Sequence, residues 1–138
     1  MTKMCEILFR GKEKNSGKWI YGDLRHISDG CGGYILCIVD NTNGRNNDVT
    51  GVEVIPETVG MFTRLNDKNR TEIFEEDIVQ ALTRYGTKHI YPIKYRNGTF
   101  WFGNWNWIEF LDRFQFREVI GNIYDNPELL RGDPNDQM

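Results

Sequence analysis

The pattern of hydrophobic and polar positions in the middle of the chain predicts a tight turn that leads into a buried strand. A polar segment, Asp-Lys-Asn-Arg at 67–70, lies between the apolar positions around Phe62 and those that begin at Ile73. Polar residues between two apolar anchors are typical of a chain reversal. The run Ile-Val-Gln-Ala-Leu at 78–82 then has the β-branched composition of a strand that enters a core.

Earlier in the chain, short apolar runs separated by polar loops predict hairpins. Residues 7–9 and 18–24 form two strand patterns joined by a charged loop, and 34–39 and 52–55 form two more. The glycine-rich loop at 28–33 could cradle a phosphate in another setting, but it lacks the lysine and the following helix of a P-loop. We therefore interpret it as a hairpin turn.

The strongest two-residue hairpin signal in the chain is Asn97-Gly98. It lies between a strand pattern at 89–96, in which tyrosines alternate with other residues, and an aromatic strand pattern at 99–102. We therefore predict that these two strands pair.

A short amphipathic helix is predicted after this hairpin. Asn106 has the position of an N-cap, and Glu109 has the position of its reciprocal partner in a capping box. Apolar residues recur at helical spacing along one stripe that we expect to face the core. The stripe consists of Trp107, Phe110, Leu111 and Phe114.

A final strand over residues 116–124, with Gly121 as a bulge, and a helical turn that begins at Pro127 complete the pattern. Together the elements predict a mainly β fold of the β-rich α+β class. It would be a small antiparallel barrel or a strongly bent sheet, with one helix in the C-terminal half. A chain of 138 residues can build one core, so we expect a single domain over residues 1–130 and a disordered tail at 131–138.

Two motifs carry a resemblance to a known family. They are Phe-Thr-x-Leu-x-Asp-Lys-Asn-x-x-Glu-Ile-x-Glu-x-Asp-Ile-Val from residue 62 and Val-Ile-Gly-Asn-Ile-Tyr-Asp-Asn-Pro-Glu-Leu-Leu from residue 119. Their main positions are Phe62, Leu65, Asp67, Asn69, Glu72, Ile73, Asp77, Ile78, Val79, Gly121, Asn122, Tyr124, Asn126 and Pro127. Both motifs are similar to those of the YopX-like proteins, which bacteriophages and prophages encode. The opening hairpin, with Phe-Arg-Gly-Lys at 9–12 and Gly-Lys-Trp-Ile-Tyr-Gly at 17–22, also resembles that of the family, so the similarity extends from Ile7 to Leu130. The resemblance implies a small β-rich protein of undefined biochemical activity, with no catalytic residues to transfer.

The chain departs from the family pattern at three positions. Arg64, Arg70 and Glu76 stand where the family usually has glycine, the residue that adopts positive φ most easily. Asparagine tolerates the left-handed region better than arginine. We therefore predict that Asn69, rather than Arg70, takes any left-handed conformation in the turn.

The composition places the chain among globular proteins, with 39% hydrophobic and 27% charged residues. The net charge of −3 argues against a general affinity for nucleic acid. No apolar run reaches the roughly 18 residues that a membrane span needs, so we expect no membrane association. The number of cysteines, 3, is odd, and the N-terminus lacks the apolar core of a signal peptide. These features predict a cytoplasmic protein, in the host cell, with reduced thiols.

Few residues offer catalytic or metal-binding chemistry. His26, Cys31 and Cys37 could in principle hold zinc or supply a nucleophile and base, but no CxxC or HxxxH pair presents two ligands together. The carboxylates between Glu72 and Asp77 could act in acid–base chemistry or hold Mg²⁺, yet beside a strand they are more often a charged edge.

The polar segment 40–48 is dense in oxygen ligands, but it fails the spacing of a calcium loop, so we interpret it as a mobile loop. We expect no metal, no cofactor, no intramolecular disulfide and no enzyme activity, since no nucleophile, base and metal occur together.

The aromatic run in the last third of the chain is the feature that bears on function. Its rings exceed what one small core needs, and aromatic residues are enriched at interfaces. We therefore predict an accessory protein that acts through protein–protein contacts, as a homo-oligomer or with a host or phage protein. The alternative is a nucleic-acid-associated module that binds bases through stacking rings beside basic groups. The candidate interaction face comprises Trp101, Trp105, Lys94 and Arg96.

Overall fold

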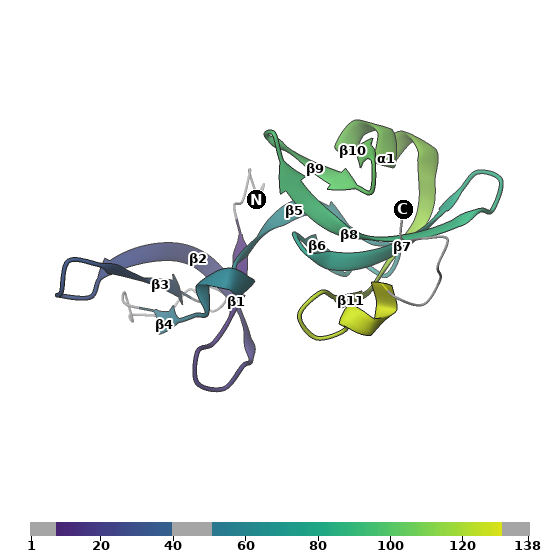
Figure 1. The fold of residues 1–138 in the computed structure, drawn as a ribbon. Helices are drawn as coiled ribbons and strands as arrows, with labels where there is room; N and C mark the ends of the chain where they lie inside the picture. Colours follow the sequence, from purple (N-terminus) through teal and green to yellow (C-terminus); the bar gives the residue numbers. More distant parts are fainter. Residues whose placement is uncertain (1–7, 40–50, 131–138) are drawn as a thin grey trace, which may run out of the picture. The chain divides into compact units, whose positions relative to one another are not determined.

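The computed structural model describes residues 8–39 and 51–130, and most of these residues lie in β-strands (Figure 1). The polar segment 40–48 and the tail 131–138 lie outside the described residues. The elements in chain order are β1 (Phe9–Lys12), β2 (Trp19–Ser28), β3 (Tyr34–Val39), β4 (Val52–Glu53), η1 (Pro56–Thr58), β5 (Gly60–Asn66), β6 (Glu72–Phe74), β7 (Asp77–Thr83), β8 (Lys88–Arg96), β9 (Thr99–Phe102), β10 (Trp105–Asn106), α1 (Trp107–Arg113), β11 (Phe114–Asn122) and η2 (Pro127–Leu130).

The chain clusters into two compact units, Met1–Phe62 and Thr63–Met138. The boundary falls within β5, which belongs to unit 1 at its start and to unit 2 at its end. The single domain over residues 1–130 stays a prediction.

Unit 1 contains strands in the order β4-β3-β2-β1-β5, and neighbouring strands in this order pair antiparallel. The glycine-rich loop is the expected turn between β2 and β3. Asp29 organises it, because one carboxylate oxygen accepts hydrogen bonds from the backbone N–H groups of Cys31 (2.7 Å) and Gly33 (3.0 Å). These bonds favour the charged carboxylate and lower the pKa of Asp29. The buried apolar residues of this unit are Cys37, Ile38, Val39 and Val54.

Unit 2 contains a five-stranded sheet in the order β10-β9-β8-β7-β11. The predicted hairpin between β8 and β9 is confirmed: Arg96 pairs with Thr99, and both Asn97 (φ 54°) and Gly98 (φ 83°) have positive φ. Positive φ at both central residues is the geometry that matches the twist of paired strands. The core of the unit consists of Ile73, Val79, Ala81, Ile93, Phe102, Phe110 and Phe114.

The turn between β5 and β6 is built on the carboxylate of Asp67. One oxygen accepts hydrogen bonds from the backbone N–H groups of Asn69 (2.8 Å) and Thr71 (2.9 Å), and the other accepts one from Val119 N–H (2.9 Å). The backbone closes the same loop, since Asp67 N–H donates to Thr71 O and Arg70 N–H donates to Asp67 O. Asp67 is buried, and hydrogen bonds from three backbone N–H groups replace those that water would make to its carboxylate.

The prediction that Asn69 takes the left-handed conformation is wrong, because Arg70 has φ 67°. A three-residue hairpin loop is a type I turn followed by one residue in the left-handed region. The bonds of Asp67 fix Arg70 in that last position, and this geometry overrides the preference of asparagine. Arg64 (φ 68°) and Glu76 (φ 72°) also have positive φ. All three departures from the family's glycines therefore occupy glycine-like conformations.

The helix α1 begins with the predicted capping box. Asn106 Oδ1 accepts a hydrogen bond from Glu109 N–H (2.9 Å), and Glu109 Oε1 accepts one from Asn106 N–H (3.0 Å). Phe110 is fully buried and Phe114, the C-cap, is 1% exposed. The prediction that Leu111 also faces the core is wrong, since its side chain is 42% exposed. The helix has 7 residues, and of its apolar stripe Phe110 and Phe114 are buried in the core whereas Leu111 is not.

The strand β11 lies at one edge of the five-stranded sheet and has two register shifts against β7. The second lies between Val119 and Gly121, which confirms the predicted bulge. The first lies between Gln115 and Glu118 and contains Phe116, whose φ is 51° and whose side chain is 64% exposed. The following residue in this bulge, an arginine, turns inward.

That arginine, Arg117, places its guanidinium carbon 5.5 Å from the centroid of the Phe110 ring. It also donates a hydrogen bond to Phe114 O (2.7 Å). Burial lowers the pKa of Arg117, because it disfavours the charged form. The bulge thus leaves the side chain of Phe116 exposed and directs the guanidinium of Arg117 toward the ring of Phe110.

The fold class is confirmed as mainly β with one α-helix in the C-terminal half. Of the two forms predicted, the described strands build sheets with open edges rather than a closed barrel. Within residues 8–39 and 51–130, no helix has the length and hydropathy needed to cross a membrane.

Candidate interaction surfaces

Three of the four predicted interaction residues, Lys94, Arg96 and Trp101, lie on one face of the β8–β9 hairpin. Lys94 is directly opposite Trp101 in the antiparallel register, and opposite residues point to the same side of a sheet. Arg96 follows two residues along β8, so it shares this face. Its guanidinium carbon lies 4.5 Å from the centroid of the Trp101 ring, which is a cation–π contact.

Most of this face is already engaged within unit 2. Arg96 covers one side of the Trp101 ring, and Trp101 Nε1–H donates a hydrogen bond to Arg96 O (3.1 Å). Lys94 Nζ forms an ion pair with Glu76 Oε1 at 2.9 Å. A base that stacked on Trp101 would therefore use one side of the ring only or displace Arg96.

The fourth predicted residue, Trp105, lies on the opposite face of the sheet. It pairs with Phe102, which is fully buried. Its ring centroid lies 4.9 Å from that of Phe114 and 5.2 Å from that of His89. Trp105 therefore packs against the core of unit 2, and the structure does not bring it together with the other three.

A second surface extends from the end of the hairpin onto α1, and we call it the apolar strip. Tyr95 and Phe100 have ring centroids 5.0 Å apart, and Phe100 and Trp107 have centroids 5.5 Å apart. Trp107 is followed on the helix by Ile108 and Leu111, which are neighbours at i and i+3. The apolar strip therefore consists of Tyr95, Phe100, Trp107, Ile108 and Leu111.

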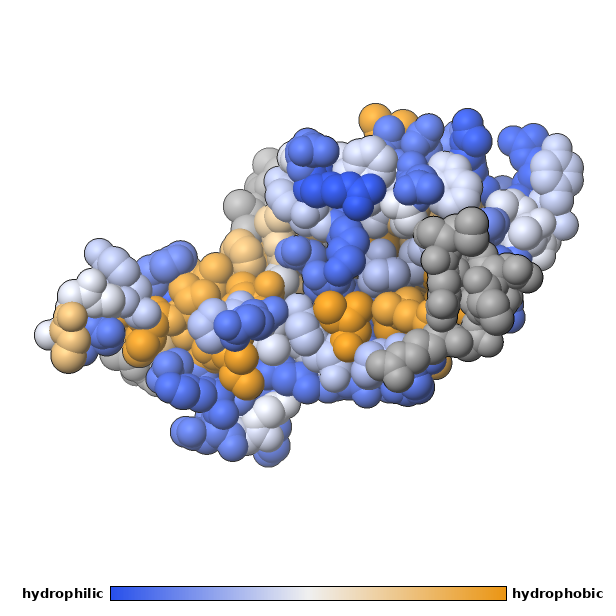
Figure 2. Space-filling view, viewed as in Figure 1, coloured by the Kyte–Doolittle hydropathy of each residue, from blue (hydrophilic) through white to orange (hydrophobic). Residues whose placement is uncertain are grey.

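The exposure of the apolar strip is the feature that our sequence reasoning missed. Ile108 is 79% exposed, Tyr95 44% and Leu111 42%. Figure 2 shows apolar surface at the top of the view, over α1. The signal was present in the sequence: Ile108 lies outside the core-facing stripe of the helix, where a polar residue is expected.

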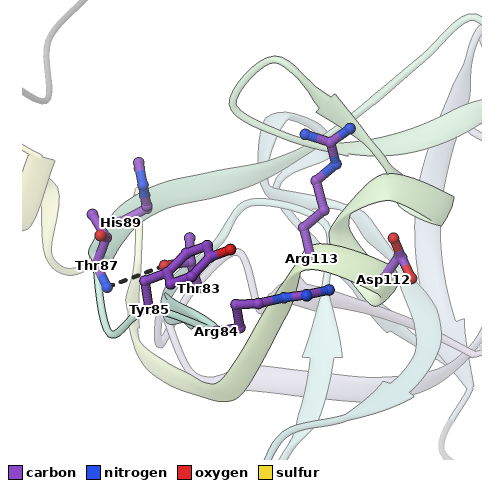
Figure 3. A pocket seen from close by; sticks show the side chains of 7 residues that line it. All are labelled: Thr83, Arg84, Tyr85, Thr87, His89, Asp112 and Arg113. Carbon is purple, nitrogen blue, oxygen red and sulfur yellow. Dashed lines mark hydrogen bonds between the residues drawn. The ribbon is translucent and has the colours of Figure 1, made fainter.

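A pocket of about 500 Å³ lies in unit 2 between the β7–β8 turn and the end of α1 (Figure 3). Its lining residues are Thr83, Arg84, Tyr85, Thr87, His89, Asp112 and Arg113. Our sequence reasoning did not single out these residues, because two short segments well separated in the chain, 83–89 and 112–113, form the lining.

The predicted signature residues lie at turns, at strand ends and in the core, and none of them lines the pocket. Asp77 Oδ2 accepts a hydrogen bond from Phe74 N–H (2.7 Å) across the β6–β7 turn. Asn122 Oδ1 accepts hydrogen bonds from the N–H groups of Tyr124 (3.0 Å) and Asp125 (2.9 Å) after β11. The positions are Phe62 and Leu65 in β5, Asp67 and Asn69 in the next turn, Glu72 and Ile73 in β6, Asp77, Ile78 and Val79 in β7, Gly121 and Asn122 in β11, and Tyr124, Asn126 and Pro127 at or before η2.

The residues weighed for metal or nucleophile chemistry have separate environments. Cys31 is exposed in the β2–β3 turn, Cys37 is buried in β3, and His26 lies in β2. In the part of the chain that the structure describes, no three His, Cys, Asp or Glu side chains gather as metal ligands. Glu76 pairs with a lysine and Asp77 caps a turn, so these two carboxylates have structural contacts.

The fold defines a small, mainly β protein of two compact units. The chain belongs to the YopX protein family, whose model matches residues 8–131. Among solved structures it is similar to protein EF1440 from Enterococcus faecalis, with 22% sequence identity and a TM-score of 0.56. That similarity covers 91% of this chain and 98% of the other, and it concerns the fold. The comparison with curated proteins finds no match.

Proposed function

We propose that this chain is a phage- or prophage-encoded accessory protein that acts through protein–protein contacts and associates with itself through the apolar strip. The observation that carries the proposal is the exposure of Ile108 and Leu111 beside the half-buried rings of Phe100 and Trp107. Exposed apolar groups that adjoin one another, unlike scattered single residues, mark interaction sites.

The expected strength of this association follows from the area that a symmetric contact would bury. Burying a side chain such as Ile108 is worth about 2 kcal/mol, and Leu111, already half-buried, contributes about half as much. A twofold contact counts each residue twice, which gives roughly 6 kcal/mol before the rings are added. Association costs about 4–15 kcal/mol, so we expect a dimer that forms in a concentration-dependent way.

Light scattering across a concentration series tests this proposal. The unmodified chain should increase in mean mass with concentration, whereas Ile108→Glu should remain a monomer and keep the same circular dichroism. Tyr34→Glu is a matched control, because Tyr34 is 73% exposed in unit 1 and lies outside the apolar strip. A monodisperse monomer at high concentration for the unmodified chain would refute self-association.

The alternative function, nucleic-acid binding, is supported by the shared face of Lys94, Arg96 and Trp101. Single-stranded DNA and RNA should be titrated at two salt concentrations, since phosphate contacts weaken as salt rises. Salt-sensitive binding that Trp101→Ala weakens would favour this alternative over self-association.

The proposed contacts take place in the cytosol of the bacterial host. The support is that Cys31 is a free cysteine in an exposed turn. Free thiols persist in a reducing compartment.

A further inference from the structure

We propose that the pocket between the β7–β8 turn and the end of α1 binds the phosphate ester of a sugar, up to the size of a nucleoside monophosphate. This site is separate from the apolar strip, none of whose residues lines it. A volume of about 500 Å³ lies within the range of small-molecule sites.

The first support is the charge of the lining. Arg84 and Arg113 are both exposed, and within the described chain neither forms an ion pair or a side-chain hydrogen bond. Asp112 is the one carboxylate of the lining, so cations exceed anions here in a chain with a net charge of −3. Figure 3 shows Arg84 extending from the turn toward the end of α1, while Arg113 extends from the helix end in a different direction, so a ligand would contact each arginine separately or draw Arg113 inward. A guanidinium binds a phosphate through two parallel hydrogen bonds.

The second support is the rigid frame beneath these side chains. Thr83 N–H donates to Thr87 O (2.9 Å), Gly86 N–H donates to Thr83 O (2.9 Å), and Thr87 N–H donates to Thr83 Oγ1 (3.1 Å). The ring of His89 packs edge-on against Trp105 (5.2 Å) and Phe114 (5.3 Å). The floor of the pocket is therefore ordered before a ligand arrives, which reduces the entropy lost on binding.

The remaining lining residues specify the body of the ligand. Tyr85 is 87% exposed at the tip of the turn, so its ring is available to stack on a planar group. The Asp112 carboxylate repels a bare anion but accepts hydrogen bonds from hydroxyl groups. The arginines can bind a phosphate, the Asp112 carboxylate can bind sugar hydroxyls, and the Tyr85 ring can stack on a base. This set of groups fits a sugar phosphate better than inorganic phosphate.

The experiment is a titration of the full chain with AMP, ribose 5-phosphate and inorganic phosphate, followed by amide chemical shifts in NMR. AMP should bind most tightly and inorganic phosphate most weakly, with shifts at the turn 83–87. Arg84→Gln and Arg113→Gln should each lower the affinity for AMP about tenfold. This is the change expected when one charge-assisted contact of about 1.4 kcal/mol is lost. Tyr85→Ala should weaken AMP and leave ribose 5-phosphate unchanged.

The matched control is Lys88→Gln, which removes an equal charge from the start of β8 at a residue outside the lining. It should bind AMP as the unmodified chain does. If Lys88→Gln weakens AMP as much as Arg84→Gln, the binding is general surface attraction and the proposal is wrong. Absence of any shift at millimolar AMP, or binding of an oligonucleotide without binding of AMP, also overturns it.

Discussion

Replacing Arg70 by glycine should stabilise the protein, although arginine is the native residue. Arg70 has φ 67° and its side chain is exposed. Its backbone N–H donates to Asp67 O (3.0 Å), a bond that glycine keeps. The substitution therefore changes the conformational energy of one residue and little else in the folded state.

The size of the effect is the difference between two opposing contributions. A left-handed conformation costs a residue with a Cβ roughly 1–2 kcal/mol. Glycine avoids that strain but loses about 0.5–1 kcal/mol more backbone entropy on folding. We therefore expect Arg70→Gly to raise the free energy of unfolding by about 0.5–1 kcal/mol, or the Tm by about 2–4 °C for a chain of this length.

The same chain contains a natural comparison in the turn between β7 and β8. Residues 83–87 repeat the backbone bonds of residues 67–71, with Gly86 (φ 84°) in the position of Arg70. A Cβ added to Gly86 would meet nothing within 4 Å, so Gly86→Ala introduces strain without a clash. It should destabilise by about the amount that Arg70→Gly stabilises.

Thermal and urea unfolding followed by tryptophan fluorescence measure these changes, with Arg70→Ala as the control for lost charge. Arg70→Ala should keep the strain and leave the stability within about 0.5 kcal/mol of the native value. The reasoning is refuted if Arg70→Gly is no more stable than Arg70→Ala.

Three further predictions test the packing and the turns of unit 2. Asp67→Ala should lower the free energy of unfolding by about 3–5 kcal/mol in urea titrations, because it leaves three N–H donors without an acceptor; a loss below 1 kcal/mol would contradict this. Phe110→Ala should lower the free energy of unfolding by about 3–5 kcal/mol, and Leu111→Ala by far less, because only Phe110 is fully buried. The same urea titrations measure both changes, and equal losses would mean that α1 faces the core differently. Gly121→Ala should lower the Tm in calorimetry, because its Cβ would lie 2.6 Å from Asn126 Oδ1; an unchanged Tm would show that this turn shifts freely.

Local chemistry in the sequence was enough to predict the hairpin at Asn97-Gly98, the capping box at Asn106 and the bulge at Gly121. The hairpin turn and the capping box each depend on residues within a few positions of one another. The bulge forms against the distant strand β7, but a glycine within a strand pattern marks its place. The conformation of Arg70 could not be predicted in this way. It depends on the Asp67 carboxylate, whose second oxygen binds Val119, 52 positions away.

The candidate surfaces show the same division between local and distant determinants. Strand alternation separates Trp101 from Trp105, and the register places Lys94 opposite Trp101. The exposure of Leu111 and the pocket beside Arg84 depend on how the helix packs within unit 2, and no periodicity in the sequence encodes that packing.

The two bulges of β11 have a consequence for how copies of this protein can meet. A flat, regular edge strand is a template to which further strands add without limit, the route to fibrils. Extra residues at Phe116 and near Gly121 interrupt the outer row of hydrogen-bonding groups, so an incoming strand would find no continuous ladder. Growth by strand addition is thereby discouraged at that edge of the five-stranded sheet.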